Sequence, residues 1–327
     1  MRCFHIAAIM VSILFPAIAF AQTESPQPQS EPKPVQTAQP SQKTLPDGQP
    51  IAECLNPIEG MSCIPGGKFL RGSDNDPHVN CKQSSYNKKH VVNTNPQMEI
   101  WMPTYYMDKT EVTTEAYKAC VAAKKCVKSG PKYVDFDRPK QPITGISWYE
   151  ANIFCKAQGK HLPTEAEWEK AARGENGDIY PWGNDVATCE NSVIMDEKGR
   201  SCGQTKRGQN PEKGRVLEVC AKGESRYGLC DMIGNAEEWV ADWYTDNYEA
   251  CGDACKGINP KGPCDGNDAE KCNKLRYKVV RGGSWYWPAE HATGIHRRSH
   301  VPSNNPGHHF GFRCAATQEE MEALLKK

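Results

Sequence analysis

Apolar residues recur at helical spacing in two short stretches of this chain, and each stretch follows a residue that can cap a helix. The first stretch has an apolar face made of Trp148, Ala151, Phe154 and Cys155. Ser147 and Glu150 have the spacing of a capping box, in which each side chain bonds the other residue's backbone N–H. Gly159 is suited to end the helix, because glycine readily adopts the left-handed conformation found there.

The second stretch repeats this pattern. Thr164 and Glu167 have capping-box spacing, and the helix that they open should continue to about Arg173. Its apolar face consists of Trp168, Ala171 and Ala172. We therefore expect two amphipathic helices that pack their apolar faces on a sheet and turn their charged faces to water.

Strand patterns flank these helices. Residues 61–73 read as a strand, a tight glycine turn and a second strand, and residues 101–107 read as a further strand. Thr113 can cap a shorter helix that extends to Ala123. Regular patterns fade over residues 180–228 and 245–274, where glycine, asparagine and lysine predict long loops.

Composition agrees with a loop-rich protein. The chain of 327 residues contains 27 glycines and 24 prolines, and few of its apolar patterns are long. The predicted fold class is therefore α+β, in one large domain. Lysine plus arginine and aspartate plus glutamate both number 40, so net charge favours neither a nucleic acid nor an anionic membrane as partner.

The N-terminal pattern predicts export from the cytoplasm. Residues 1–21 have a basic start, an apolar stretch and a small-residue cleavage site, which is typical of a secretory signal peptide. Residues 22–53 are rich in proline and glutamine and predict a disordered tether. The folded domain should then occupy residues 54–316, with a short C-terminal tail at 317–327. We expect a secreted or periplasmic protein with no membrane-spanning segment.

Cysteine usage fits an oxidising compartment. Of the 16 cysteines, 15 would remain after cleavage of the signal peptide, so one thiol is free or forms an intermolecular disulfide. Cys120 and Cys126 bracket the end of a predicted helix and can form a local bridge. Four further cysteines lie in one loop: Cys251, Cys255, Cys264 and Cys272. They lack the paired spacing of a zinc site, and we favour two disulfides, with three possible connectivities.

A stretch near the C-terminus combines paired glycines with three aromatic rings. Val279, Val280 and Arg281 lead into Gly282-Gly283-Ser284-Trp285-Tyr286-Trp287. Glycine pairs beside bulky rings indicate a place where backbone approaches backbone closely. We name residues 282–292 the signature loop. Five of the nine histidines of the chain lie in or after it: His291, His296, His300, His308 and His309.

Seven short motifs in fixed order carry a family resemblance. They are Gly66-Gly67-x-Phe69-x-x-Gly72-Ser73, Glu111-Val112-Thr113, residues 162–169 (LPTEAEWE), Pro181-Trp182-Gly183, Gly234-Asn235-x-x-Glu238-Trp239, residues 281–285 (RGGSW) and Gly311-Phe312-Arg313. Together they resemble the formylglycine-generating enzyme family, also called sulfatase-modifying factors, over roughly residues 58–316. The resemblance implies a single disulfide-stapled domain related to the C-type lectin fold.

The resemblance also implies a structural calcium ion. Its ligands would be the Asp231 side chain, the carbonyl oxygens of Gly234 and Ala236, and the Glu238 carboxylate, and such oxygen donors suit a hard cation. The alternative is that Asn235 and Glu238 merely cap a short helix. A second family calcium site would use the loop near Asn191, where this sequence diverges.

One family disulfide carries over to Cys155 and Cys314. The family's copper-binding cysteines do not carry over. The resemblance places them at Trp287 and Ala292, and the sequence contains no cysteine between Cys272 and Cys314. Soft sulfur ligands are what Cu(I) prefers, and the retained Ser284 cannot replace them. We therefore expect no formylglycine generation, and neither copper nor iron as cofactor.

Sister enzymes of ergothioneine synthesis share the Arg281–Trp285 motif, but they bind iron through histidines of an additional N-terminal domain. Here only the signal peptide and the tether are expected before the shared domain. Within the signature region itself, His291, His296 and His300 are speculative ligands for a transition metal. A surface loop with solvated histidines is the interpretation that we favour over a metal site.

Two functions remain open. In the first, the domain is catalytically inactive and binds a protein or a glycan through the aromatic residues Trp287 and Tyr286, stabilised by calcium. In the second, it is an oxygen-dependent oxidoreductase of altered chemistry, like the pyoverdine-maturation members of the family.

Overall fold

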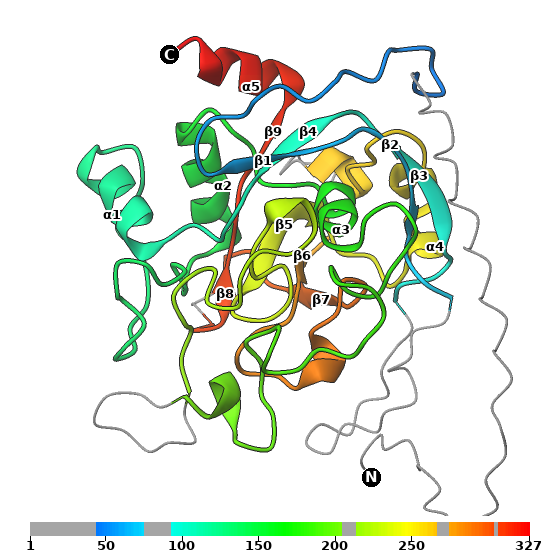
Figure 1. Ribbon diagram of the computed structural model, residues 1–327. Coiled ribbons are helices and arrows are strands. Elements are labelled where there is room, and N and C mark those ends of the chain that lie inside the picture. Colours follow the sequence, from blue (N-terminus) through cyan, green and yellow to red (C-terminus); the bar gives the residue numbers. More distant parts are fainter. Residues whose placement is uncertain (1–43, 75–92, 205–213, 267–274, 304–306) are drawn as a thin grey trace, which may run out of the picture.

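Three small sheets and the helices around them form the framework of the protein (Figure 1). The structure is a computed structural model that describes residues 44–74, 93–204, 214–266, 275–303 and 307–327. The described residues do not include the expected signal peptide with Cys3, most of the expected tether, Cys81 or Cys272. The prediction of an odd thiol is therefore not tested.

The sheets are short and mostly antiparallel. The first pairs β1 (Met61–Ile64), β4 (Tyr105–Asp108) and β9 (Ala315–Thr317) in the order β1-β4-β9. The second pairs β2 (Gly67–Arg71) with β3 (Met98–Met102). The third has the order β7-β6-β5-β8, with strands Arg297–His300, Lys278–Arg281, Glu237–Trp243 and Phe310–Gly311. Only its β5–β8 pair is parallel.

The two strands expected in residues 61–73 are confirmed as β1 and β2, and they join different sheets. A further strand prediction needs correction. The single strand expected over residues 101–107 is split into β3 and β4. The break falls at Pro103, which has no N–H to donate to a sheet ladder.

The three predicted helices form with the predicted caps. They are α1 (Thr114–Ala122), α2 (Trp148–Ala157) and α3 (Glu165–Arg173). Thr113 caps α1, and both α2 and α3 begin with a complete capping box. All four residues of the predicted apolar face of α2 are buried.

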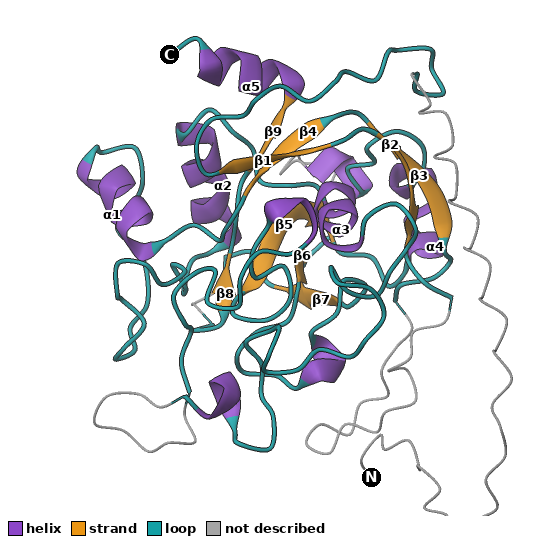
Figure 2. Ribbon diagram, viewed as in Figure 1, coloured by secondary structure: helices purple, strands orange, loops and turns teal. Residues whose placement is uncertain are grey.

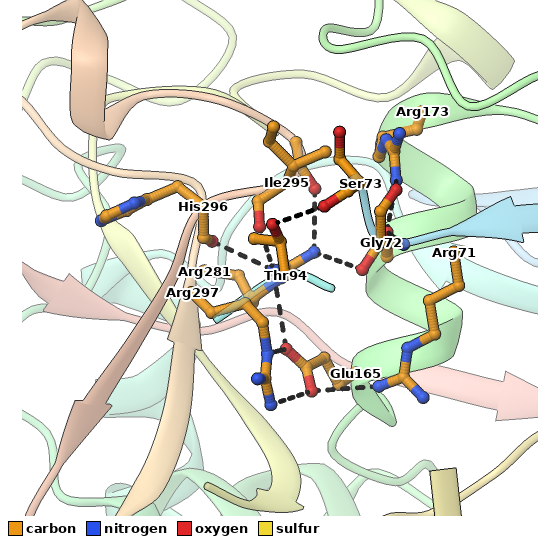
Figure 3. A network of polar contacts seen from close by, with 12 residues as sticks. Arg71, Gly72, Ser73, Thr94, Glu165, Arg173, Arg281, Ile295, His296 and Arg297 are labelled. Carbon is orange, nitrogen blue, oxygen red and sulfur yellow. Dashed lines mark hydrogen bonds and ion pairs between the residues drawn. The ribbon is translucent and has the colours of Figure 1, made fainter. Parts of the chain in front are cut away.

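Helix α3 differs from the prediction of an amphipathic surface helix, because all nine of its residues are buried. Its charged side chains do not reach water, and they are satisfied by ionic partners inside the protein. Figure 3 shows how Glu165 lies between Arg71 and Arg297. A helical charge pattern alone cannot distinguish a solvated face from a face that is paired internally.

The buried ion-pair network connects α3 with three strands. Glu165 is 3.0 Å from Arg71 at the end of β2 and 2.6 Å from Arg297 at the start of β7. Glu169 is 2.7 Å from Arg281 at the end of β6 and 2.5 Å from Arg173. Burial alone would raise the pKa of Glu165, but Arg297, Arg281 and Arg71 together lower it to about 2. The carboxylates are therefore ionised and paired throughout the physiological pH range.

Disulfides fix the elements that the sheets leave loose. Cys155 on α2 is bonded to Cys314 beside β9, and Cys120 to Cys126, so both expected bridges are present. In the loop with four cysteines, Cys251 pairs with Cys255. Further bridges join Cys54 to Cys63, Cys189 to Cys202, and Cys220 to Cys230. Every cysteine among the described residues is in a disulfide.

The domain extends beyond its expected ends. Leu45 is 6 % exposed and a bridge joins Thr44 to Pro50, so the last residues of the expected tether pack on the domain. The expected tail forms helix α5 (Gln318–Leu325), whose Met321 is buried. His161 joins this helix to α3, since its ring nitrogens lie 2.6 Å from Glu320 and 3.1 Å from Glu167.

Long loops make up much of the remaining described chain, as the sequence predicts, and they include residues 180–204, 214–228 and 245–266 (Figure 2). They contain short 3₁₀ turns and the brief helix α4 (Tyr248–Cys251). Within the described part of the chain no helix is long and apolar enough to span a bilayer.

Removing one carboxylate of the buried network should be strongly destabilising. We expect Glu165→Gln to lower the free energy of unfolding by about 3–5 kcal/mol, because the arginines would lose a buried partner. The measurement is chemical denaturation at pH 7 under non-reducing conditions.

The matched control is Glu99→Gln, since Glu99 pairs with Lys68 at 3.2 Å on the surface and both side chains are nearly half exposed. This control should change stability by no more than about 1 kcal/mol. Equal small effects of the two substitutions would contradict a supporting role for the network.

Candidate functional site

The signature loop begins at a glycine pair that leaves no room for side chains. Gly282 and Gly283 have φ values of 90° and 68°, which favour glycine. A Cβ on Gly283 would lie 2.5 Å from the carbonyl oxygen of His291, and one on Gly282 would lie 2.9 Å from that of Met232. The loop therefore folds back on its own far end and packs on the turn before β5, as the glycine pattern predicts.

Backbone hydrogen bonds attach the loop to two neighbouring segments. The Trp285 N–H donates to the Asn235 carbonyl, and the Ser201 N–H donates to the Trp285 carbonyl, both at 2.9 Å. The Met195 N–H donates to the Trp287 carbonyl at 2.9 Å. The loop is thus held from both sides, which fixes where its aromatic rings lie.

The residues at the family's catalytic positions have different degrees of burial. Ser284 and Ala292 are fully buried, and Trp285 is 1 % exposed. Tyr286 and Trp287 are only partly buried. The Trp287 indole N–H is shielded from water and has no hydrogen-bond partner. Of the aromatic residues in the loop, Tyr286 and Trp287 are therefore the ones that can contact a ligand.

Cationic and histidine side chains surround these two rings. The Arg200 guanidinium lies 3.5 Å from the centre of the Tyr286 ring, and that of Arg298 lies 5.0 Å from the centre of the Trp287 ring. The His309 ring is stacked against Tyr286 at 5.5 Å. Burial, reinforced by the charge of Arg298, lowers the pKa of His309 well below its usual value, so this imidazole is neutral at pH 7.

The structure brings two of the three speculative metal ligands together. The Nδ1 atom of His291 lies 3.3 Å from Nε2 of His296, and both side chains are buried. His300 instead packs against Phe310 and Trp239. Across the described residues, no three histidine, cysteine, aspartate or glutamate side chains converge as a metal centre would require. The proposed trio therefore does not form one site.

A cleft of about 500 Å³ opens beside the signature loop. Residues 288–290 of the loop form one wall, and residues 194–198 form part of the other. Its charged lining residues are Glu190, Asp196, Glu197, Lys198 and Glu290. The cleft is thus mainly acidic, and the wall that it shares with the signature loop directly follows Trp287 in the sequence.

The turn at residues 231–238 does not cap a helix, which corrects the alternative interpretation of Asn235 and Glu238. The Asn235 side chain accepts a hydrogen bond from Leu217 N–H at 2.9 Å and donates to Glu111 at 3.0 Å. Glu238 lies on strand β5. Gly234 donates its N–H to the Gly282 carbonyl at 2.9 Å, so this turn directly supports the signature loop.

Three buried carboxyl groups meet behind the turn, opposed by one arginine. Both oxygens of Glu238 accept hydrogen bonds from Arg313, and one also accepts from the Trp168 indole N–H at 2.8 Å. Glu238 is thereby fully satisfied. Asp231 accepts from the Cys220 N–H and lies beside the Glu111 carboxyl group, whereas Oε2 of Glu111 is buried and finds no N–H donor among the described residues.

The charge of Glu111 and Asp231 is not balanced within this cluster. Burial raises the pKa of Asp231 to about 6, and it raises that of Glu111 well above its usual value, with the charge of Asp231 adding to the effect. The pair therefore needs a proton or a cation. Asp231 also lines a pocket of about 340 Å³ together with Asn191, which gives a cation a path from solvent.

These observations test the implied calcium ligands. Asp231 and Glu111 offer carboxylate oxygens that fit a hard cation, and Glu111 has an oxygen to spare. Glu238 does not fit that role, because arginine and tryptophan donors occupy its oxygens. Glu111 was not among the calcium ligands expected from the sequence. Its place in the Glu111-Val112-Thr113 motif could have marked it as a candidate, but this motif lies far from the turn in the sequence.

The comparisons with known proteins agree with this architecture. A family model described as the sulfatase-modifying factor enzyme 1-like domain matches residues 47–318. The formylglycine-generating enzyme of Bos taurus is 34% identical over 193 residues, which cover 57% of this chain and 47% of the bovine protein. Serine/threonine-protein kinase pkn1 of Chlamydia caviae is 29% identical over 278 residues, covering 78% of this chain and 37% of that protein.

This chain spans 37–59% of the length of the first five curated relatives that it matches. Among solved structures, PvdO from Pseudomonas aeruginosa superposes with a TM-score of 0.57 at 20% identity, covering 78% of this chain and 93% of PvdO. Treponema denticola variable protein 1 gives a TM-score of 0.53 at 22% identity, covering 78% of this chain and 94% of that protein. The α+β fold of the formylglycine-generating enzyme type, related to C-type lectins and stapled by disulfides, is thus confirmed.

Two tryptophans of the signature loop should differ in their contribution to stability. We expect Trp285→Ala to lower the free energy of unfolding by about 3–5 kcal/mol, because it leaves a cavity among Phe136, Val193 and Ala236. Trp287→Ala should cost clearly less, since its ring is partly exposed. Thermal unfolding of both variants measures this difference. A loss for Trp287→Ala as large as that for Trp285→Ala would place Trp287 in the core.

Proposed function

The chain belongs to the sulfatase-modifying factor enzyme 1-like family, and on this premise we propose that it is an extracytoplasmic binding or accessory domain that does not generate formylglycine. The proposal rests on the residues that the resemblance places at the family's copper-binding positions. These residues are Trp287 and Ala292, and residues 273–313 contain no cysteine. Neither an indole nor a methyl group can bind Cu(I) as a thiolate does.

What remains at this position favours recognition over oxidation. The rings of Tyr286 and Trp287 are partly exposed and held in place by Arg200, Arg298 and His309. Rigid aromatic rings provide contact area at a low cost in conformational entropy. The acidic cleft beside Trp287 supplies a concave surface next to them. A protein or glycan partner would bind across these rings and into this cleft.

A mass-spectrometric assay tests the absence of formylglycine generation. Purified protein is incubated with Cu(I), oxygen and a peptide that contains the sulfatase-type Cys-x-Pro-x-Arg sequence. We expect the peptide mass to stay unchanged, because no thiolate pair is present to hold copper. The formylglycine-generating enzyme of Streptomyces coelicolor, a relative 31% identical over 189 residues, serves as the active control under the same conditions. Conversion of the thiol to an aldehyde would refute the proposal.

A second candidate function is an oxidoreductase of altered chemistry, and the close pair His291 and His296 favours it. Two imidazoles beside a partly exposed tryptophan provide nitrogen donors of the kind that copper and iron accept. The fold similarity to PvdO is compatible with this function but does not establish it. Metal titration of the intact protein distinguishes the candidates: stoichiometric binding that is lost in His296→Gln would favour the oxidoreductase.

Calcium forms part of the proposed function as a structural ion. Asp231 and Glu111 would hold it, and their carboxylates would then be balanced by a cation instead of a proton. Because the Gly234 turn donates to the Gly282 carbonyl, calcium at this turn would also stiffen the signature loop.

Calcium should therefore raise the melting temperature of chelator-treated protein. Binding to the folded state alone stabilises it by mass action, by about 2.7 kcal/mol at a hundredfold excess over the dissociation constant. We expect Glu111→Gln to lose this increment, measured by thermal unfolding with and without calcium.

The matched control for the calcium prediction is Glu224→Gln. Glu224 lines the same pocket as Asp231, but its side chain is 59% exposed. This variant should keep the full calcium response. A calcium response of equal size in Glu111→Gln would rule out the ligand set, and no response in the unaltered protein would rule out the ion.

A further inference from the structure

A cluster of lysines lies on helix α1 and on the loop that follows it. Lys118, Lys124, Lys125, Lys128 and Lys132 are all exposed. No aspartate or glutamate occurs in the sequence between Glu115 and Asp135. Within the described part of the chain, none of these lysines is in a salt bridge. We name these five residues the lysine cluster.

The start of the loop that carries the cluster is cross-linked. The Cys120–Cys126 disulfide closes it at the end of α1. The Tyr117 hydroxyl donates to the Val127 carbonyl at 2.9 Å, and its ring is stacked against Phe154 of α2. These contacts hold the backbone in place up to Val127, directly before Lys128, so binding would have less of the loop to order.

The cluster borders an open groove of about 690 Å³. Its cationic lining residues are Lys118, Lys128 and Lys132, and its acidic ones are Asp137 and Glu150. The hydroxyl-bearing residues of the lining are Ser129, Ser147 and Ser303. One groove therefore offers ammonium donors, hydroxyl groups and carboxylate acceptors.

Like charges without internal partners repel each other and destabilise the folded state, so an external anion would relieve this repulsion. The chain as a whole has no net charge, so the excess of positive charge at this surface is local. A large field of one sign raises the local concentration of oppositely charged ligands. The cluster therefore predicts a ligand with several negative charges.

We propose that the groove binds an acidic polysaccharide, with the ammonium groups contacting its carboxylate or sulfate groups. The mixed lining favours a sugar over an acidic peptide. Asp137 and the Oε1 atom of Glu150 can accept hydrogen bonds from sugar hydroxyls, which ionised acidic side chains would not donate. The Oε2 atom of Glu150 already accepts from Ser147 in the helix cap. Next to Lys132 in the sequence, Tyr133 is 46% exposed, and its ring can cover the apolar side of a sugar.

This surface goes beyond the proposed function and uses different residues, although the two sites adjoin. The rings of Tyr133 and His308 meet edge to face, with their centres 4.8 Å apart. The centre of the His308 ring lies 5.5 Å from that of the Tyr286 ring in the signature loop. Helix α1 and its loop stand at one edge of the molecule in Figure 1, where a long chain has access. A polysaccharide in the groove could bring the aromatic site to a glycan-bearing surface.

Binding of polygalacturonate oligomers to the full chain tests the proposal, measured by calorimetry at low salt. We expect Lys128→Gln combined with Lys132→Gln to weaken binding about thirtyfold, since each lysine near an anionic surface contributes about 1 kcal/mol and about 1.4 kcal/mol corresponds to a tenfold change. The matched control removes two lysines from another groove, Lys156→Gln with Lys261→Gln, and should bind as the unaltered protein does.

Two further measurements separate this proposal from its competitors. Poly-L-glutamate of similar length should bind much more weakly than the sugar, and equal binding would mean that the groove recognises acidic chains in general. Trp287→Ala shows which of the two sites holds the sugar. A loss of polygalacturonate binding in this variant as large as that in the double lysine variant would place the sugar at the signature loop and overturn the proposal. Absence of binding by the unaltered protein, or an equal loss in the control variant, would overturn the proposal.

Discussion

The buried pairing of Glu165 and Glu169 with arginines is the interaction on which the rest of the structure depends. These two carboxylates lie on one helix, while their partners come from β2, β6 and β7. The small sheets have few hydrogen bonds of their own to hold them in place. Ion pairs in a low-dielectric interior fix the relative positions of elements that a short ladder cannot. Removing one member of the network would leave an unpaired charge in the interior, which strongly destabilises the folded state. The network therefore favours the one arrangement of α3, β2, β6 and β7 in which every charge is paired.

The network also closes the base of the signature loop. Arg281 immediately precedes the glycine pair, and its guanidinium donates to the carbonyl oxygens of Gly294, Ile295 and His296. The chain thus leaves the network at Arg281 and returns to it at Arg297. The intervening loop is anchored at both ends by charges that cannot leave the interior.

A second ionic node supports the loop from behind. Glu238 joins Arg313 of the Gly-Phe-Arg turn to Trp168 of α3, so the turn before β5, the closing segment and the central helix meet there. Burial raises the pKa values of the adjoining carboxyl groups of Glu111 and Asp231, because the node offers no second cation to balance them. A structural cation at this place would connect the state of the turn to that of the signature loop through Gly234.

Features that depend on near neighbours in the chain were predictable from the residues alone. The capping boxes at Ser147 and Thr164 were predictable, because each is a contact between residues three positions apart. The glycine pair at Gly282 was predictable as a close approach, and the order of short motifs was sufficient to identify the family and its fold.

Features that depend on residues far apart in the chain became apparent only in the folded protein. The charges of α3 resemble a solvated surface in the sequence, and their arginine partners lie far away along the chain, so burial could not be inferred. The same holds for Glu111, which meets Asp231 only in the folded protein. His300 shows the converse, since nearness in sequence to His296 did not bring the two side chains together. Sequence periodicity shows which face of a helix or strand is apolar and which is polar. The packing of the whole chain decides what each face contacts.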